Sequence, residues 1–161
     1  EALALLDEQA TSKTQTLLAP YVLLKQGQAQ RLAGETPTGW EQLLADHATH
    51  SAAAEARYEL GKQEPAQWET LLENHPSHPR AVKVALAQLK TATSKDKLLL
   101  VAAHGLYREE YEASLDRLVE NYGSELTPEQ WESVGFGYWE NLRYGDAGNA
   151  YGNAPASPVN L

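Results

Sequence analysis

Cysteine is absent from the 161 residues of this chain. The chain therefore has no disulfide framework, no thiolate metal ligand and no cysteine nucleophile. This absence is compatible with an oxidising compartment without proving one. Methionine is absent too, even at position 1, and no signal-peptide pattern opens the chain. We therefore expect residues 1–161 to be a segment excised from a longer protein.

Basic side chains are few. Lys and Arg number 13 against 22 Asp and Glu, and the net charge is −9. A protein that binds a phosphate backbone needs clustered cations, and no stretch of this chain provides them. No apolar run approaches the roughly 18 residues of a membrane-spanning helix. We expect neither a nucleic-acid partner nor a membrane span.

Strand-like alternation of useful length is also absent, and apolar residues recur instead at helical spacing. The pattern predicts helices of roughly 8–17 residues joined by short turns. Capping boxes are predicted at Thr38 with Glu41 and at Thr127 with Gln130, since each threonine can accept a backbone N–H that the helix start leaves unpaired.

Apolar stripes and glycines predict helix faces and helix ends. One predicted stripe holds Leu18, Val22, Ala29 and Leu32, and another holds Trp131, Val134, Tyr138 and Leu142. Helix stops are predicted at Gly34, Gly61, Gly123 and Gly145. Residues 155–161 are predicted to be a loop or tail.

The segment of eleven residues at 40–50 recurs in similar form at 68–78. Trp, Glu, two Leu and two His recur at the same offset. Self-similarity at a period of roughly 20–50 residues indicates a solenoid, and single helix pairs must stack because none can bury its apolar face alone. The repeated apolar residues are Trp40, Leu43, Leu44, Trp68, Leu71 and Leu72.

The C-terminal part of the chain resembles the tetratricopeptide repeat. The matching residues are Trp131, Val134, Gly135, Tyr138, Ala147, Tyr151 and Ala154. The resemblance implies that the small residues lie where two helices cross, with aromatic rings filling the gap between them. We predict an all-α fold, a right-handed α–α superhelix of short antiparallel helix pairs, as a single domain over residues 1–161.

A narrower resemblance covers most of residues 21–158. Trp-x-x-Leu-Leu before a His-Pro turn, then Gly-Tyr-Trp-Glu-Asn (137–141) and Ala-Tyr-Gly-Asn-Ala-Pro (150–155), resemble the non-catalytic superhelix of soluble lytic murein transglycosylases of the cyanobacterial type. In that family the superhelix precedes a domain whose catalytic Glu cleaves peptidoglycan glycan strands. The Glu-Ser and Gly-Leu-Met-Gln motifs around that Glu have no match here.

This resemblance implies a segment without catalytic residues or cofactor. Its partners would be its own catalytic domain and the glycan strand, and its location the periplasm or cell envelope. The alternative is a tetratricopeptide-like adaptor whose concave face binds a partner peptide or protein. The sequence that follows residue 161 in the parent protein would separate these two interpretations.

The repeated histidines His47, His50, His75 and His78 form the first candidate site. Four imidazoles could bind Zn²⁺ if the two turns met. Adjacent repeats place such turns roughly 10 Å apart, however, which is too far for one tetrahedral site. Each pair also spans a helix end, where histidine interacts favourably with the last carbonyls. We therefore predict capping rather than metal binding.

A run of carboxylates forms the second candidate site, and paired carboxylates can serve acid–base catalysis. These residues alternate with an apolar stripe, which is typical of a solvated helix face. We predict that Arg108 and Arg117 pair weakly with them on the surface. The carboxylates are Glu109, Glu110, Glu112 and Asp116.

Aromatic residues form the third candidate site. Trp40, Trp68 and Trp131 lie on the apolar stripes and are predicted to be core residues. Trp139 is one residue off its stripe, and Tyr144 follows about a turn later. If the chain contacts a glycan or a partner, we predict that Trp139 and Tyr144 make that contact.

Overall fold

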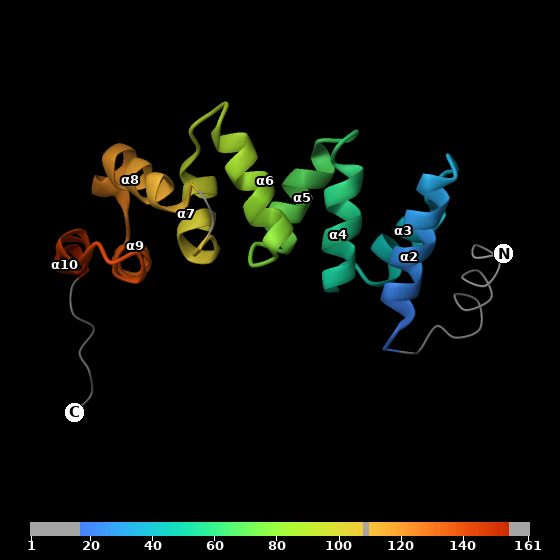
Figure 1. Ribbon diagram of the computed structural model, residues 1–161, viewed down its shortest axis with the longest axis horizontal. Helices are drawn as coiled ribbons and strands as arrows, with labels where there is room; N and C mark the ends of the chain where they lie inside the picture. The colour runs from blue at the N-terminus through green and yellow to red at the C-terminus, as the bar shows by residue number, and fades with distance from the viewer. Residues whose placement is uncertain (1–16, 108–109, 155–161) are drawn as a thin grey trace. The chain divides into compact units, whose positions relative to one another are not determined.

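The computed structural model describes residues 17–107 and 110–154, and the secondary-structure elements in this part of the chain are all helices joined by short turns (Figure 1). It contains nine α-helices and one short 3₁₀-helix, and no strand occurs in it. The all-α prediction is confirmed, and the right-handed superhelix stays a prediction. Arg108, Glu109 and the predicted loop over 155–161 lie outside the described residues. The helices are α2 (Ala19–Leu32), α3 (Thr38–Asp46), α4 (Ser51–Leu60), α5 (Ala66–Asn74), α6 (Pro79–Leu89), α7 (Lys95–His104), α8 (Tyr111–Tyr122), η1 (Gly123–Glu125), α9 (Pro128–Glu140) and α10 (Tyr144–Asn153).

The chain forms two compact units, Glu1–Ala81 and Val82–Leu161. The N-terminal unit holds α2 to α5 and the first residues of α6, and the C-terminal unit holds the remainder. In the N-terminal unit, α2, α3 and α4 contact one another, and α4 contacts α5. In the C-terminal unit, α9 contacts α7, α8 and α10. Each unit thus buries its helices against neighbours in the sequence, as stacked helix pairs must.

Trp40 lies at the centre of the N-terminal unit, with 1% of its surface exposed. Its indole Nε1 donates to the carbonyl of Leu24 at 3.1 Å. The ring lies directly against Gly27, where any Cβ would clash with it. The surrounding core consists of Leu23, Leu24, Leu43, Ala52, Ala53 and Ala56, with Leu44 and Leu60 partly buried against it.

The second tryptophan of the repeat is packed in the same way. Trp68 Nε1 donates to the carbonyl of Tyr58 at 3.0 Å, and its ring lies against Gly61. In both copies the accepting carbonyl belongs to the residue three places before the glycine. The sequence repeat is therefore also a structural repeat, in which an indole rests on a glycine.

α2 buries a different face from the predicted one. Leu18 and Leu32 of the predicted stripe are 66% and 90% exposed. The helix instead turns Gln30 towards α3, where its Nε2 donates to Thr38 Oγ1 at 2.8 Å and its Oε1 accepts from Gly39 N at 3.0 Å. Close packing and hydrogen bonding, rather than apolar spacing, select this face. Its buried residues are Pro20, Leu23, Leu24, Gln26, Gly27 and Gln30.

The two predicted capping boxes have different outcomes. The box at α9 is confirmed, since Gln130 N donates to Thr127 Oγ1 at 3.4 Å and Thr127 N donates to Gln130 Oε1 at 3.0 Å. The box at Thr38 is wrong, because this residue lies inside α3 after the N-cap Pro37 and its hydroxyl accepts from Gln30. A partner on α2 therefore takes the hydroxyl that a local cap would use.

Most of the predicted helix stops are found at helix ends. Gly61 and Gly123 are C-cap residues, and Gly34 follows the cap of α2 with a φ of 77° that suits glycine. The predicted stop at Gly145 is wrong, because this residue lies inside α10. Leu142 is also misplaced in the predicted stripe, since it follows α9 with a φ of 61° and is 71% exposed.

α8 and α9 come together at Tyr111 and Gly137. Tyr111 is 2% exposed and donates its hydroxyl to the carbonyl of Ala102 at 2.9 Å. Burial, together with the charge of Glu140, raises the pKa of Tyr111 to about 12. Gly137 lies against this hydroxyl, and a Cβ there would clash with it. This contact fixes the face of α9 that points inward and thereby the residues that remain outside.

Candidate functional site

The four repeated histidines lie at helix ends in the N-terminal unit. His47 and His75 are the C-cap residues of α3 and α5, with a φ of −137° in both and ψ of 39° and 50°. His50 and His78 cap the helices that follow, because each Nδ1 accepts from the backbone N–H two residues later, at 3.1 and 3.2 Å. This second role was not predicted, since it gives histidine the function that Ser, Thr, Asp or Asn usually has.

Three of these histidines, His50, His75 and His78, hydrogen-bond to the backbone. His75 is 8% exposed, and its Nε2 lies 2.9 Å from the carbonyl oxygen of Ala48 in the preceding repeat. Burial lowers the pKa of His78, and Glu55 only partly opposes this shift. The His78 ring is therefore neutral at pH 7, which leaves its Nδ1 lone pair available for the cap. Within residues 17–107 and 110–154, no group of three or more His, Cys, Asp or Glu side chains could hold a metal ion.

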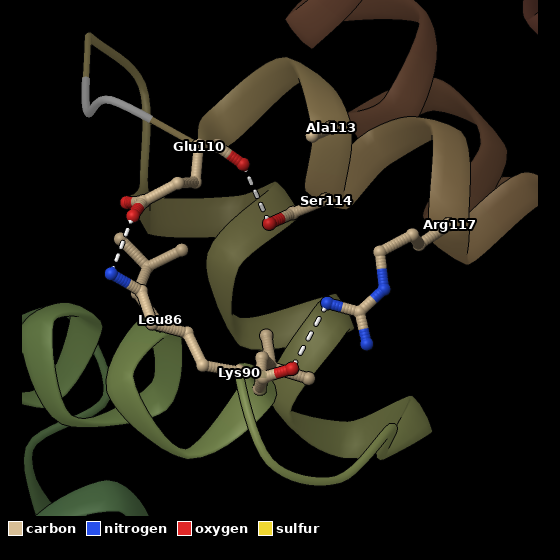
Figure 2. A pocket seen from close by; sticks show the side chains of 7 residues that line it. Leu86, Lys90, Glu110, Ala113, Ser114 and Arg117 are labelled. Atoms are coloured by element: carbon tan, nitrogen blue, oxygen red, sulfur yellow. Dashed lines mark hydrogen bonds and ion pairs between the residues drawn. The ribbon is translucent and has the colours of Figure 1, made fainter.

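Of the four predicted carboxylates, the structure describes Glu110, Glu112 and Asp116, and these three do not share one site. Glu110 Oε1 pairs with Lys90 Nζ at 2.8 Å (Figure 2). Glu112 is exposed on α8. Asp116 contacts the turn between α9 and α10 instead. These carboxylates therefore face different surroundings, and no shared position for a reacting atom lies between them.

A small cavity lies beside Glu110 and measures about 130 Å³ (Figure 2). Arg117 lines it, and among residues 17–107 and 110–154 its side chain pairs with no carboxylate, contrary to the prediction. Its Nη1 donates to the carbonyl of Leu89 at 3.1 Å, and its Nη2 donates to Thr93 Oγ1 at 2.8 Å. Small-molecule sites usually measure roughly 300–1,000 Å³. The cavity is smaller, and the guanidinium beside it already holds α8 against the end of α6.

Trp139 and Tyr144 lie together on the surface of the C-terminal unit. Their ring centroids are 5.0 Å apart, and their planes meet at 67° in an edge-to-face arrangement. Both side chains are 54% exposed. Trp131, by contrast, is half-buried. The two aromatic residues that sequence reasoning selected for binding are therefore brought into contact.

A hydrogen-bonded network fixes the turn between these two rings. Arg143 Nη1 donates to both oxygens of Asp116, at 2.8 and 3.0 Å, and Arg143 Nε donates to Asp146 Oδ2 at 2.9 Å. Tyr138 donates its hydroxyl to Asp116 Oδ1 at 2.9 Å and lies 4.6 Å from the Arg143 guanidinium. Tyr138, which precedes Trp139, and Arg143, which precedes Tyr144, thus bind the same carboxylate. The turn therefore cannot move without breaking these bonds.

The protonation states of this network are set by its own contacts. Burial by itself would raise the pKa of Asp116, but the hydrogen bonds from Arg143 and Tyr138 hold that pKa below its ordinary value. The bond to Asp116 raises the pKa of Arg143. Burial, followed by the same carboxylate, raises the pKa of Tyr138. At neutral pH the network therefore consists of a carboxylate, a guanidinium and a neutral phenol.

Asp116→Asn is expected to lower the free energy of unfolding at pH 7 by about 1 kcal/mol, after allowance for solvent screening of this half-exposed pair. Because the folded-state pKa of Asp116 is depressed, its contribution is present above the unfolded pKa of about 3.9 and is lost as pH falls through the folded value. Urea unfolding at several pH values should show the two proteins converging below about pH 4.

Glu112→Gln is the matched control for this prediction, since it removes the same charge from the exposed face of α8. Its unfolding curve should follow that of the wild type at every pH. A constant difference between Asp116→Asn and the wild type across this pH range would contradict the role assigned to the charge.

Further exposed apolar side chains near the aromatic pair were missed by sequence reasoning. Phe136 is 51% exposed and lies three residues before Trp139, so the two rings are neighbours on the surface of α9. Tyr107 is 79% exposed and donates its hydroxyl to Glu140 Oε2 at 3.0 Å. The spacing of Phe136 and Trp139 could have indicated this second face. We call Phe136, Trp139 and Tyr144 the aromatic surface.

The residues that match the tetratricopeptide pattern lie where α9 and α10 meet. Tyr151 covers Gly135, where a Cβ would be 2.9 Å from the tyrosine ring. Ala147 is 1% exposed on the facing side of α10, and Ala154 is its half-buried C-cap residue. A small residue on each helix thus allows the two to approach closely.

These features define an all-helical protein with a repeated packing motif and an exposed aromatic surface. Comparison with protein-family models, with curated proteins and with solved structures gives no match for this chain. Among the described residues, no helix is long and apolar enough to cross a membrane.

Proposed function

We propose that this chain is a non-catalytic scaffold segment of a peptidoglycan-cleaving lytic transglycosylase, acting in the periplasm or cell envelope. Its role is to position the catalytic domain and the glycan strand, and the aromatic surface makes the contact with glycan. The observation that carries this proposal is the pairing of Trp139 with Tyr144, both half-exposed and held by a rigid turn.

The chemistry of the aromatic surface suits a neutral sugar chain. Aromatic rings combine a large apolar face with a polar edge, and a pyranose ring presents C–H groups on its faces and hydroxyls at its rim. The charged groups of the turn, Arg143, Asp116 and Asp146, are already paired with one another. The net charge of −9 also disfavours a polyanionic ligand.

Trp139→Ala is expected to weaken binding to insoluble peptidoglycan by about fivefold, since one aromatic contact contributes roughly 1 kcal/mol. The measurement is the fraction of protein that sediments with the polymer at increasing polymer concentration. Tyr21→Ala, which removes an aromatic residue that is 49% exposed in the N-terminal unit, should bind like the wild type.

Two outcomes would count against the proposal in different ways. Equal binding by Trp139→Ala and the wild type would remove the aromatic surface from the contact. A wild-type protein that stays wholly in the supernatant would remove glycan as the partner.

The second candidate is a tetratricopeptide-like adaptor that binds a partner peptide or protein. The packing of Tyr151 on Gly135, with Ala147 on the facing helix, favours it. The sequence that follows residue 161 in the parent protein separates the two functions. Glu-Ser and Gly-Leu-Met-Gln motifs would support the first, and a different domain or a stop would support the second.

A further inference from the structure

The N-terminal unit contains a larger cavity, of about 330 Å³, between the end of α2, α4 and the start of α6. This volume falls within the range of roughly 300–1,000 Å³ that small-ligand sites occupy. Leu32, which is 90% exposed, and the buried Trp40 form its apolar part. Gln28 and four charged side chains, Arg31, Glu55, Glu59 and Arg80, form the remainder.

Two arginines line this cavity, and each lies over an aromatic ring. The Arg31 guanidinium is 5.6 Å from the centroid of Trp40, and that of Arg80 is 4.5 Å from the centroid of Tyr58. Stacking on a ring holds a guanidinium in place while leaving its N–H groups available. Both arginines are therefore preorganised donors at the wall of a cavity.

The hydrogen-bonding capacity of these arginines is largely unused by the described part of the chain. Arg80 binds both oxygens of Glu55 through Nε alone, at 3.1 and 2.9 Å, which leaves its Nη1 and Nη2 without a partner there. Arg31 has no carboxylate partner within residues 17–107 and 110–154, and its guanidinium lies over the Trp40 ring. The α2 side of the cavity thus carries an uncompensated positive charge.

The α4 side carries the opposite charge. Glu55 and Glu59 are four residues apart and so project from one face of α4. Glu55 is paired with Arg80 through both oxygens, but Glu59 uses only Oε2, which pairs with Lys62. Its Oε1 has no partner in the described part of the chain. One cavity therefore presents free guanidinium donors from Arg31 on α2 and Arg80 on α6, together with a free carboxylate oxygen of Glu59 on α4.

We propose that this cavity binds a short zwitterionic peptide, with its carboxylate on Arg31 and Arg80, its ammonium on Glu59, and an apolar C-terminal side chain against Leu32. The two opposite charges of such a ligand match the free guanidinium donors and the free carboxylate oxygen of the cavity. Leu32, which follows Arg31 in the sequence and lines the same cavity, offers the apolar contact for the C-terminal side chain. The proposal rests on the N-terminal unit alone and is independent of the proposed function.

Isothermal titration calorimetry with the dipeptide Ala-Leu and two modified forms tests this proposal. The C-terminal amide lacks the carboxylate, and the N-acetyl form lacks the ammonium. Each should bind the wild-type protein about tenfold more weakly than Ala-Leu, because each loses one charge-assisted contact. Equal affinity for all three peptides, or no measurable binding of Ala-Leu, would overturn the proposal.

Two variants assign the contacts. Arg31→Gln should bind Ala-Leu as weakly as the wild type binds the amide, with its affinity for the amide unchanged. Glu59→Gln should do the same with respect to the acetylated form. Lys95→Gln, which removes one positive charge in the C-terminal unit, should bind all three peptides like the wild type. A loss with Lys95→Gln as large as that with Arg31→Gln would reduce the effect to net charge and contradict the site.

Discussion

Trp40→Ala is expected to lower the free energy of unfolding by about 3–5 kcal/mol, the largest effect of any substitution considered for this protein. Trp40 is 1% exposed, so its removal leaves a cavity where α2, α3 and α4 meet. The substitution also leaves the Leu24 carbonyl without its indole donor, and an unpaired buried acceptor adds to the loss. Urea unfolding followed by far-UV circular dichroism measures this effect.

Trp68→Ala is the matched comparison, because Trp68 occupies the same position in the second copy of the repeat. It makes the same kind of bond, to the Tyr58 carbonyl, but is only half-buried. Its removal should therefore cost less, about 1.5–3 kcal/mol. Equal losses for the two variants would contradict the assignment of Trp40 as the centre of the unit.

Gly27→Ala is expected to lower the free energy of unfolding by about 2–3 kcal/mol, although alanine is the better helix former by about 1 kcal/mol. A Cβ at this position would clash with the Trp40 ring. The ring cannot move away, because it is buried and its Nε1 is bound to Leu24 in the same helix. The same urea unfolding experiment measures the effect.

Gly148→Ala, the same substitution at another helical position, is expected to change the free energy of unfolding in the opposite direction. Gly148 lies inside α10, and nothing is within 4 Å of the position that its Cβ would take. Alanine should therefore stabilise the protein by about 0.5–1 kcal/mol through helix propensity alone. A gain in stability at both positions would show that Trp40 does not rest on Gly27.

The helical class and the repeat could be predicted because both depend on local spacing. Trp40 and Trp68 recur with their leucines at a fixed offset. In the structure each indole packs against a glycine and donates to a backbone carbonyl. The cap at Thr127 could be predicted for the same reason, since Gln130 is its only required partner.

The face of α2 and the role of Thr38 could not be predicted, because both depend on contacts across the fold. Gln30 is polar and would be placed on the outside by any pattern, yet it is buried where it binds Thr38 and Gly39. A glycine such as Gly27 carries no apolar signal, although the Trp40 ring lies directly against it.

The candidate site was predictable in part. The position of Trp139 off the apolar stripe predicts an exposed ring, and this ring is exposed beside Tyr144. The network that holds the turn was not predictable, because Asp116 lies far from Arg143 in the sequence and reads there as a surface carboxylate.

The turns that hold His47 with His50 and His75 with His78 would allow the N-terminal unit to be lengthened by whole helix pairs. A tandem duplication of residues 47–74 would create a junction in which His47 follows α5 just as His75 does now, and His50 would again begin the next helix. The duplicated segment would also contain Trp68 and Gly61, so the packing of the indole on the glycine would be copied with the turn. A gene encoding this protein could therefore lengthen its array by one helix pair in a single recombination event, with no new turn to evolve.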